Sequence, residues 1–152
     1  MKKILRNMKK IVVLFFLCLI SSANLAKSQS MVSEITWTDA NYITYQGLLV
    51  LYPNNSGDFM VKFYNANIGW VWCHQKATLT NQYDAYGNCL SYINCSYPKT
   101  SPSVPYSADN FLIYPNGAMY TQDYSGNWST LITAYVVQPA YWQSKMQEYG
   151  LR

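Results

Sequence analysis

The chain has 152 residues, of which 50% are hydrophobic, 16% are aromatic and only 12% are charged. Its formal net charge of +4 comes from the first 27 residues, which contain six of the eleven basic residues and no acidic one. The rest of the chain has five basic and seven acidic residues, so no patch remains that would neutralise phosphates, and nucleic-acid binding is not expected. The high apolar and aromatic content also argues against intrinsic disorder.

Residues 1–28 are typical of a cleaved secretory signal peptide. Lys9 and Lys10 precede an apolar run, residues 11–20, that is too short to cross a bilayer, because a spanning helix needs about 20 apolar residues. Small residues suit cleavage after Ser28, although an earlier site fits too, and an uncleaved N-terminal anchor is the alternative. We therefore predict a single β-rich domain over residues 29–152, without a transmembrane span, in a secreted, periplasmic or outer cell envelope location.

The segment after the leader shows short apolar runs separated by turn signals, a pattern that favours an antiparallel sandwich or small barrel. All fifteen tyrosines and all five tryptophans lie after residue 30, and aromatic residues suit half-buried, pleated surfaces. Strict alternation places Phe59, Val61 and Phe63 on one face of a strand. We expect an all-β fold of about seven strands, near residues 42–52, 59–65, 70–80, 89–97, 111–115, 118–124 and 129–138.

Two connections between these strands have the residues of tight turns. Asn116-Gly117 is a strong hairpin signal, and Asp84 with Gly87 suits a type I turn followed by a glycine in the left-handed region. In the loop at 53–58, Gly57 is expected to adopt a positive φ.

The end of the domain differs from its strands. Residues 98–110 contain three prolines and few large apolar side chains, which indicates a long surface loop. Pro139 suits the first turn of a helix and Gly150 its end, so we predict a short C-terminal helix whose Trp142, Met146 and Tyr149 pack on the sheet.

A small secreted all-β chain with a C-terminal helix is similar to the lipocalin-type calycins. The Gly-x-Trp signature of that family is absent, since Trp37 is preceded by Ile35-Thr36. We therefore assign no family from the sequence.

The most distinctive segment for function is residues 70–77. Alternation along a strand places Trp70, Trp72, His74 and Lys76 on one face. Val71, Cys73 and Ala77 fall on the other, which is the better core. An exposed aromatic stripe could stack on sugar rings or anchor a protein partner. The alternative is that both tryptophans line a barrel interior or lie under the long loop, because tryptophan is mostly buried on average.

No catalytic or metal centre can be assembled from the sequence. His74 is the single histidine, and its neighbour Cys73 points to the opposite face of the strand, so the two cannot pair. Zinc needs four suitable ligands, and the available set with Cys89 and Cys95 lacks a Cys-x-x-Cys knuckle. We predict no catalytic residue, no metal and no cofactor.

Removal of the leader leaves three cysteines in a chain expected to reach an oxidising compartment. Folding residues 73–95 as a hairpin brings Cys73 and Cys95 to nearly the same level, so these two are the candidate disulfide, with Cys89 as a free thiol near the turn. Three reduced cysteines packed as small apolar residues are the alternative.

These observations favour a secreted or envelope-associated binding or accessory module without enzymatic activity. Its ligand would be a glycan, a small apolar molecule or a protein of the cell envelope, recognised through aromatic residues such as Trp70 and Trp72. A small hydrolase whose site is assembled only in three dimensions, or a structural envelope protein, is the alternative.

Overall fold

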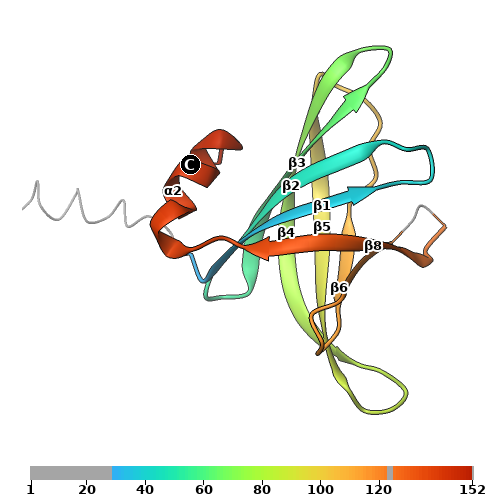
Figure 1. The fold of residues 1–152 in the computed structure, drawn as a ribbon, viewed down its shortest axis with the longest axis vertical. Coiled ribbons are helices and arrows are strands. Elements are labelled where there is room, and N and C mark those ends of the chain that lie inside the picture. The colour runs from blue at the N-terminus through green and yellow to red at the C-terminus, as the bar shows by residue number, and fades with distance from the viewer. Residues whose placement is uncertain (1–28, 123–124, 152) are drawn as a thin grey trace, which may run out of the picture.

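The computed structural model describes residues 29–122 and 125–151, and the predicted signal peptide lies outside the described residues. Within them, eight antiparallel strands close into a barrel in sequence order, and β1 completes the ring by pairing with β8 (Figure 1). The predicted all-β fold with a short C-terminal helix is confirmed, and it takes the form of a barrel. The elements are β1 (Met31–Thr38), β2 (Thr44–Leu51), β3 (Ser56–Asn65), β4 (Gly69–Tyr83), β5 (Cys89–Ser101), β6 (Asn110–Ile113), β7 (Met119–Gln122), β8 (Trp128–Val136), the 3-10 helix η1 (Pro139–Tyr141) and α2 (Trp142–Glu148).

Strand β1 is the element that the sequence analysis did not predict. It pairs with β2 over its whole length and with β8 from Ser33 to Thr36. The turn after β1 is held by Asp39, whose Oδ1 accepts hydrogen bonds from the backbone amides of Asn41 (2.9 Å) and Ile43 (3.0 Å). This aspartate-centred turn divides residues 31–51 into two strands of eight residues each.

The inward side chains of the strands fill the barrel with a core rich in aromatic rings. The rings of Phe59 and Phe111 meet edge to face with centroids 5.1 Å apart, and Trp37 stacks on Tyr45 at 5.0 Å. Gly47 lies beside this cluster, and a Cβ atom there would collide with the Phe59 ring. The interior is therefore packed with side chains, as in other small barrels.

A second apolar cluster lies outside the barrel, where α2 covers the outer face of the first strands. Val32, Leu48 and Val50 point outward from β1 and β2 and pack with Met146 and Tyr149 of the helical segment. Trp142 packs against the same cluster and donates a hydrogen bond from Nε1 to the carbonyl of Val137 (2.7 Å). The predicted packing of the helix on the sheet is confirmed.

The helix is also fastened by charge and by its C-terminal turn. Lys145 Nζ lies 2.8 Å from Glu34 Oε1 on β1 and 3.1 Å from Glu148 Oε2, and hydrogen bonds to these carboxylates raise the pKa of the lysine. Gly150 takes a φ of 70°, which lets the amide of Leu151 reach the carbonyl of Met146 (2.8 Å). This left-handed glycine closes the helix in the way predicted from the sequence.

Residues 102–109 connect β5 to β6, and they do not form a simple surface loop. Tyr106 turns inward, stacks on Phe63 at 5.5 Å and contacts Tyr45 at 6.5 Å. The loop is shorter than predicted because β5 continues to Ser101 through Pro98. Its central tyrosine therefore closes one end of the aromatic core.

Candidate functional site

The outer face of β4 carries the four side chains singled out in the sequence. Val71, Cys73 and Ala77 are buried in the barrel, so the alternation predicted for this strand is correct. A register shift between His74 and Lys76 in the pairing with β5 leaves the continuous pairing with β3 undisturbed. The outward side chains divide into three environments along the strand, at Trp70, at Trp72, and at His74 with Lys76.

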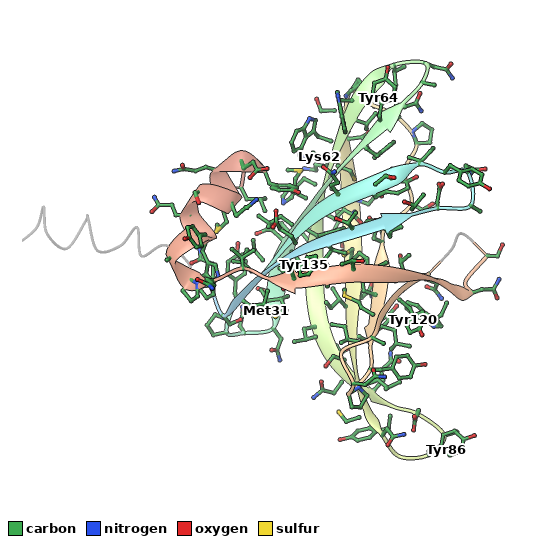
Figure 2. The ribbon with its side chains drawn as sticks, in the orientation of Figure 1. Met31, Lys62, Tyr64, Tyr86, Tyr120 and Tyr135 are labelled. Atoms are coloured by element: carbon green, nitrogen blue, oxygen red, sulfur yellow. The ribbon has the colours of Figure 1, made fainter. Side chains whose placement is uncertain are left out.

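Trp70 lies near the exposed tip of the β3–β4 hairpin. Its register partner on β3 is Tyr64, and the two rings meet edge to face with centroids 5.7 Å apart. Each of these residues is 56% exposed. Pairing between β4 and β5 ends at Trp72, so this end of the hairpin extends beyond its neighbour, as Figure 2 shows near the label of Tyr64. Trp70 therefore does not line the barrel interior.

Trp72, in contrast, is half-covered by the C-terminal segment. Its ring meets that of Tyr149 at 6.2 Å, and the ammonium group of Lys62 lies 5.5 Å from the centre of the Trp72 ring and 5.0 Å from that of Tyr149. The lysine therefore bridges two aromatic faces by cation–π contact. Trp72 therefore holds the C-terminal segment against the sheet and is only partly available for recognition of a ligand.

An open groove lies beside Trp72, where the end of α2 meets the outer face of the sheet. It encloses about 320 Å³ and is lined by Met60, Trp72 and residues 147–150. Glu148 supplies the single carboxylate in the lining of this groove. Glycoside hydrolysis needs two facing carboxylates, so the lining does not provide that chemistry. The groove contains no assembled catalytic set.

His74 and Lys76 belong to a polar cluster centred on Asp58 of β3. The Asp58 Oδ1 atom lies 2.9 Å from His74 Nε2 and 2.5 Å from Lys76 Nζ, and Oδ2 accepts a 2.7 Å hydrogen bond from the hydroxyl of Tyr52. Burial of the carboxyl raises its pKa, but the hydrogen bonds from Lys76, Tyr52 and His74 outweigh this effect and hold the pKa below its usual range.

This cluster places a histidine, a carboxylate and a hydroxyl group together, so its suitability for catalysis can be judged from geometry. In a nucleophilic triad the hydroxyl would contact the histidine ring. Here the Tyr52 hydroxyl donates to the same carboxylate that accepts from His74. The contacts found in the described residues give His74 no serine, threonine or cysteine partner, so the cluster is an ion-paired network that joins β3 to β4.

A second buried polar group lies inside the barrel, and the sequence analysis did not identify it. Gln75 is fully buried; its Nε2 donates to Asp109 Oδ2 (2.5 Å) and its Oε1 accepts from the Asp109 amide (2.9 Å). The hydroxyl of Tyr106 donates to the same carboxylate (3.1 Å). Burial raises the pKa of Asp109 to about 6, against the opposing effect of these hydrogen bonds. The three side chains hold the 102–109 loop in place.

The predicted disulfide between Cys73 and Cys95 is not formed, because the register on which it depended is different. Residue Cys95 lies opposite Ala77, and Cys73 lies opposite Thr100. The hairpin is tighter than expected, since β4 continues to Tyr83, and this shifts the pairing by several residues. The three cysteines among the described residues are free thiols; Cys73 and Cys95 are buried, while Cys89 is exposed near the turn.

No group of three or more histidine, cysteine, aspartate and glutamate side chains in residues 29–122 and 125–151 is arranged to hold a metal ion. None of the helices formed by these residues is sufficiently long and apolar to cross a bilayer.

No family model, curated protein or solved structure matches this chain. The function of the protein is therefore inferred from the geometry of its surface. This inference is based on the exposed Tyr64–Trp70 pair. Trp70 is a candidate site residue from the sequence, and Tyr64 is its partner in the strand register.

Proposed function

We propose that this protein is a secreted or envelope-associated binding module without enzymatic activity, and that it recognises a glycan with Tyr64 and Trp70. The observation that carries the proposal is the exposure of these two rings, each 56% accessible, at the projecting end of the β3–β4 hairpin. Large aromatic side chains are costly to leave in water, and their exposure in a pair marks a surface for interaction.

The surroundings of the pair suit a sugar. The faces of a sugar ring are apolar C–H surfaces that stack on aromatic rings, whereas its rim needs hydrogen-bonding groups. Asn67 is exposed in the turn next to the pair, and the Lys62 ammonium lies farther along β3 on the same outward face. A protein partner anchored on Trp70 is the competing outcome, favoured by the exposure of Ile68 in the same turn.

Two other classes of function have less support. A ligand-binding barrel needs a wide interior, but here the rings of Trp37, Phe59, Phe111 and Tyr106 occupy it. A hydrolase needs a free base beside a nucleophile, but the Asp58 carboxylate is shared among Tyr52, His74 and Lys76.

The test is a glycan array of neutral and acidic oligosaccharides probed with the protein lacking residues 1–28, followed by titration of the best ligand. Trp70→Ala and Tyr64→Ala should each weaken binding at least about tenfold, the loss of roughly 1.4 kcal/mol expected for a stacked ring. Their thermal melts should stay close to that of the parent protein.

The matched control is Tyr86→Ala, because Tyr86 is 91% exposed at the tip of the β4–β5 hairpin, at the other end of the molecule in Figure 2. Unchanged affinity is expected for this variant. A protein that binds no glycan on the array, or whose Trp70→Ala and Tyr64→Ala variants bind as tightly as Tyr86→Ala, would contradict the proposal.

A further inference from the structure

A second group of aromatic side chains lies on the outer face of β5–β8, on the side of the closed ring opposite β3 and β4. The register aligns Tyr92, Leu112 and Tyr120 on three adjacent strands, and all three point away from the barrel core formed by Ile93 and Phe111. Tyr114 and Trp128 complete the group. We refer to Tyr92, Tyr114, Tyr120 and Trp128 as the aromatic platform.

The rings of the platform contact one another across the strands. Tyr92 on β5 and Trp128 on β8 meet edge to face with centroids 5.8 Å apart, so they meet above the two strands, β6 and β7, that lie between them. Tyr114 and Tyr120 form a similar pair at 5.6 Å. Leu112 is only 7% exposed, whereas Trp128 and Tyr114 are 37% and 38% exposed. Among the described side chains of this face, solvent therefore reaches aromatic rings, and the aliphatic side chain of Leu112 is covered.

Apart from Asp123, in the connection between β7 and β8, the segments that build this face contain no charged residue. The sequence has no aspartate, glutamate, lysine, arginine or histidine at positions 85–98, 110–122 or 124–144. Hydrogen-bonding groups are amides: Asn110 Nδ2 donates to Gln122 Oε1 (3.1 Å), and Gln122 Nε2 donates to the carbonyl of Gly126 (2.7 Å). Asn94 is exposed one strand away, opposite Asn110.

The chemistry of this surface favours one class of ligand. A nucleic acid, an acidic peptide or a charged polysaccharide would find no opposite charge here. Tyrosine and tryptophan are also enriched in protein interfaces, so a protein partner is the competing occupant, and the sedimentation measurement below tests it for a second copy of this chain. A neutral sugar chain requires ring surface in contact with solvent beside uncharged amide groups, and Trp128, Tyr114 and Asn94 supply both.

We propose that the aromatic platform binds a neutral glycan chain and that Trp128 and Tyr114 supply the stacking contacts. This site is separate from the Tyr64–Trp70 pair and does not require that pair to bind sugar. With both surfaces active, the protein would present two glycan contacts on opposite sides of one barrel and would cross-link a polysaccharide.

The experiment uses the Trp70→Ala background, in which the hairpin contact is removed, and measures affinity electrophoresis against hydroxyethyl cellulose and against alginate. Migration should remain retarded by the neutral polymer and not by the acidic one. Adding Trp128→Ala, or separately Tyr114→Ala, should reduce the retardation by the neutral polymer at least about tenfold in apparent affinity. Two positions are tested so that a loss of stability in one variant is not mistaken for a loss of binding.

The matched control is Tyr135→Ala, which removes an exposed aromatic ring, 68% accessible, from the same strand β8 but outside the platform. It should migrate like its Trp70→Ala parent. The proposal is overturned if both platform variants migrate like this control, if alginate retards the protein as strongly as hydroxyethyl cellulose, or if sedimentation shows a dimer that Trp128→Ala dissociates while no polymer is bound.

The design separates the two proposals. Full retardation of Trp70→Ala that disappears with Trp128→Ala would refute hairpin binding of this polymer and support the platform. Retardation that Trp70→Ala alone abolishes would refute the platform and support the hairpin.

Discussion

The aromatic residues inside the barrel and those on its outer surface are the same types of side chain in opposite roles. Phe59 contacts Trp37 and Phe111 and is fully buried, so its neighbours hold it from several strands. Trp70 contacts the ring of Tyr64 and remains half in water. The number of aromatic residues does not by itself locate a binding surface. The strand register locates it, because the register sets whether each ring points into the barrel or out of it.

The largest expected effect tests the inner group. Phe59→Ala should lower the free energy of unfolding by about 3–5 kcal/mol, because it leaves a cavity among rings that cannot close around it. Trp70→Ala should change it by less than about 0.5 kcal/mol. Urea unfolding followed by circular dichroism gives both values, and similar losses in the two variants would remove the distinction between inner and outer rings.

The next prediction concerns pH and the loop that closes the core. Because burial raises the folded-state pKa of Asp109 to about 6, the protonated carboxyl is the form that the fold prefers. Its contribution to stability is complete below the unfolded-state pKa of about 4 and is lost as the pH rises through 6. The loss should be about 3 kcal/mol, an order of magnitude set by a shift of roughly two pKa units.

Asp109→Asn isolates this effect, since the amide keeps the shape of the side chain but does not titrate. The unfolding free energy of the parent protein minus that of the variant should fall between pH 4 and pH 7. The difference is needed because Asp58 has the opposite sign: its pKa is lowered, so its contribution is lost on acidification. A difference that rises with pH would show that the Asp109 carboxylate is stabilised by its hydrogen bonds.

A smaller loss is expected at the outer polar cluster. Asp58→Asn keeps an acceptor for the buried Tyr52 hydroxyl but removes the charge that faces His74 and Lys76, and it should cost about 1 kcal/mol. Lys76 is largely exposed, so solvent screens its share. Thermal unfolding with and without 1 M NaCl measures the effect, which should shrink in salt. A loss as large as that of Phe59→Ala would place this cluster among the main determinants of stability.

The smallest effect is a chemical one, with no change in stability expected. Iodoacetamide should modify the exposed thiol of Cys89 in the native protein and leave Cys73 and Cys95 unmodified. Burial raises the pKa of Cys73 to about 12 and also raises that of Cys95, so neither forms the reactive thiolate near neutral pH. Mass spectrometry counts the adducts, and a peptide that links Cys73 to Cys95 would show that the two inner thiols can meet after all.

The sequence predicted the fold where the alternation of apolar residues was strict, as in β3 and β4, and where turn residues had one reading, as at Asn116-Gly117, whose glycine takes a φ of 83°. It missed β1, because both faces of this strand are covered: Val32 packs in the outer cluster and Ile35 in the barrel, so apolar and polar residues do not alternate along it. The positive φ predicted for Gly57 is wrong, because Asn55 takes the positive φ in this loop, at 62°. Glycine is needed at position 57 because a Cβ atom there would collide with the backbone of Val50.

The candidate site was predicted in part for a similar reason. Alternation placed Trp70 and Trp72 on one face, but only the third dimension shows that Tyr149 covers the second of them. The partner of Trp70, Tyr64, follows from the pairing register, which depends on the length of the turn between the strands. Neither the aromatic platform nor the Gln75–Asp109 contact has a local sequence signal, because each joins residues from strands or loops that are distant in the chain.

The pairing of β1 with β8 has a consequence for how the chain reaches this structure. Every other pairing in the ring joins consecutive strands through a short connection, so those contacts are local in sequence. The entropy of closing a loop grows only slowly with its length, yet long-range pairing still slows folding when it must precede local contacts. In this barrel the long-range pairing need not come first, because seven hairpins can form one after another before Ser33–Thr36 pairs with β8. Pairing of β1 with β8 is thus the step at which an open, curled sheet loses its two free edges. Through those edges, partly folded chains would pair with each other.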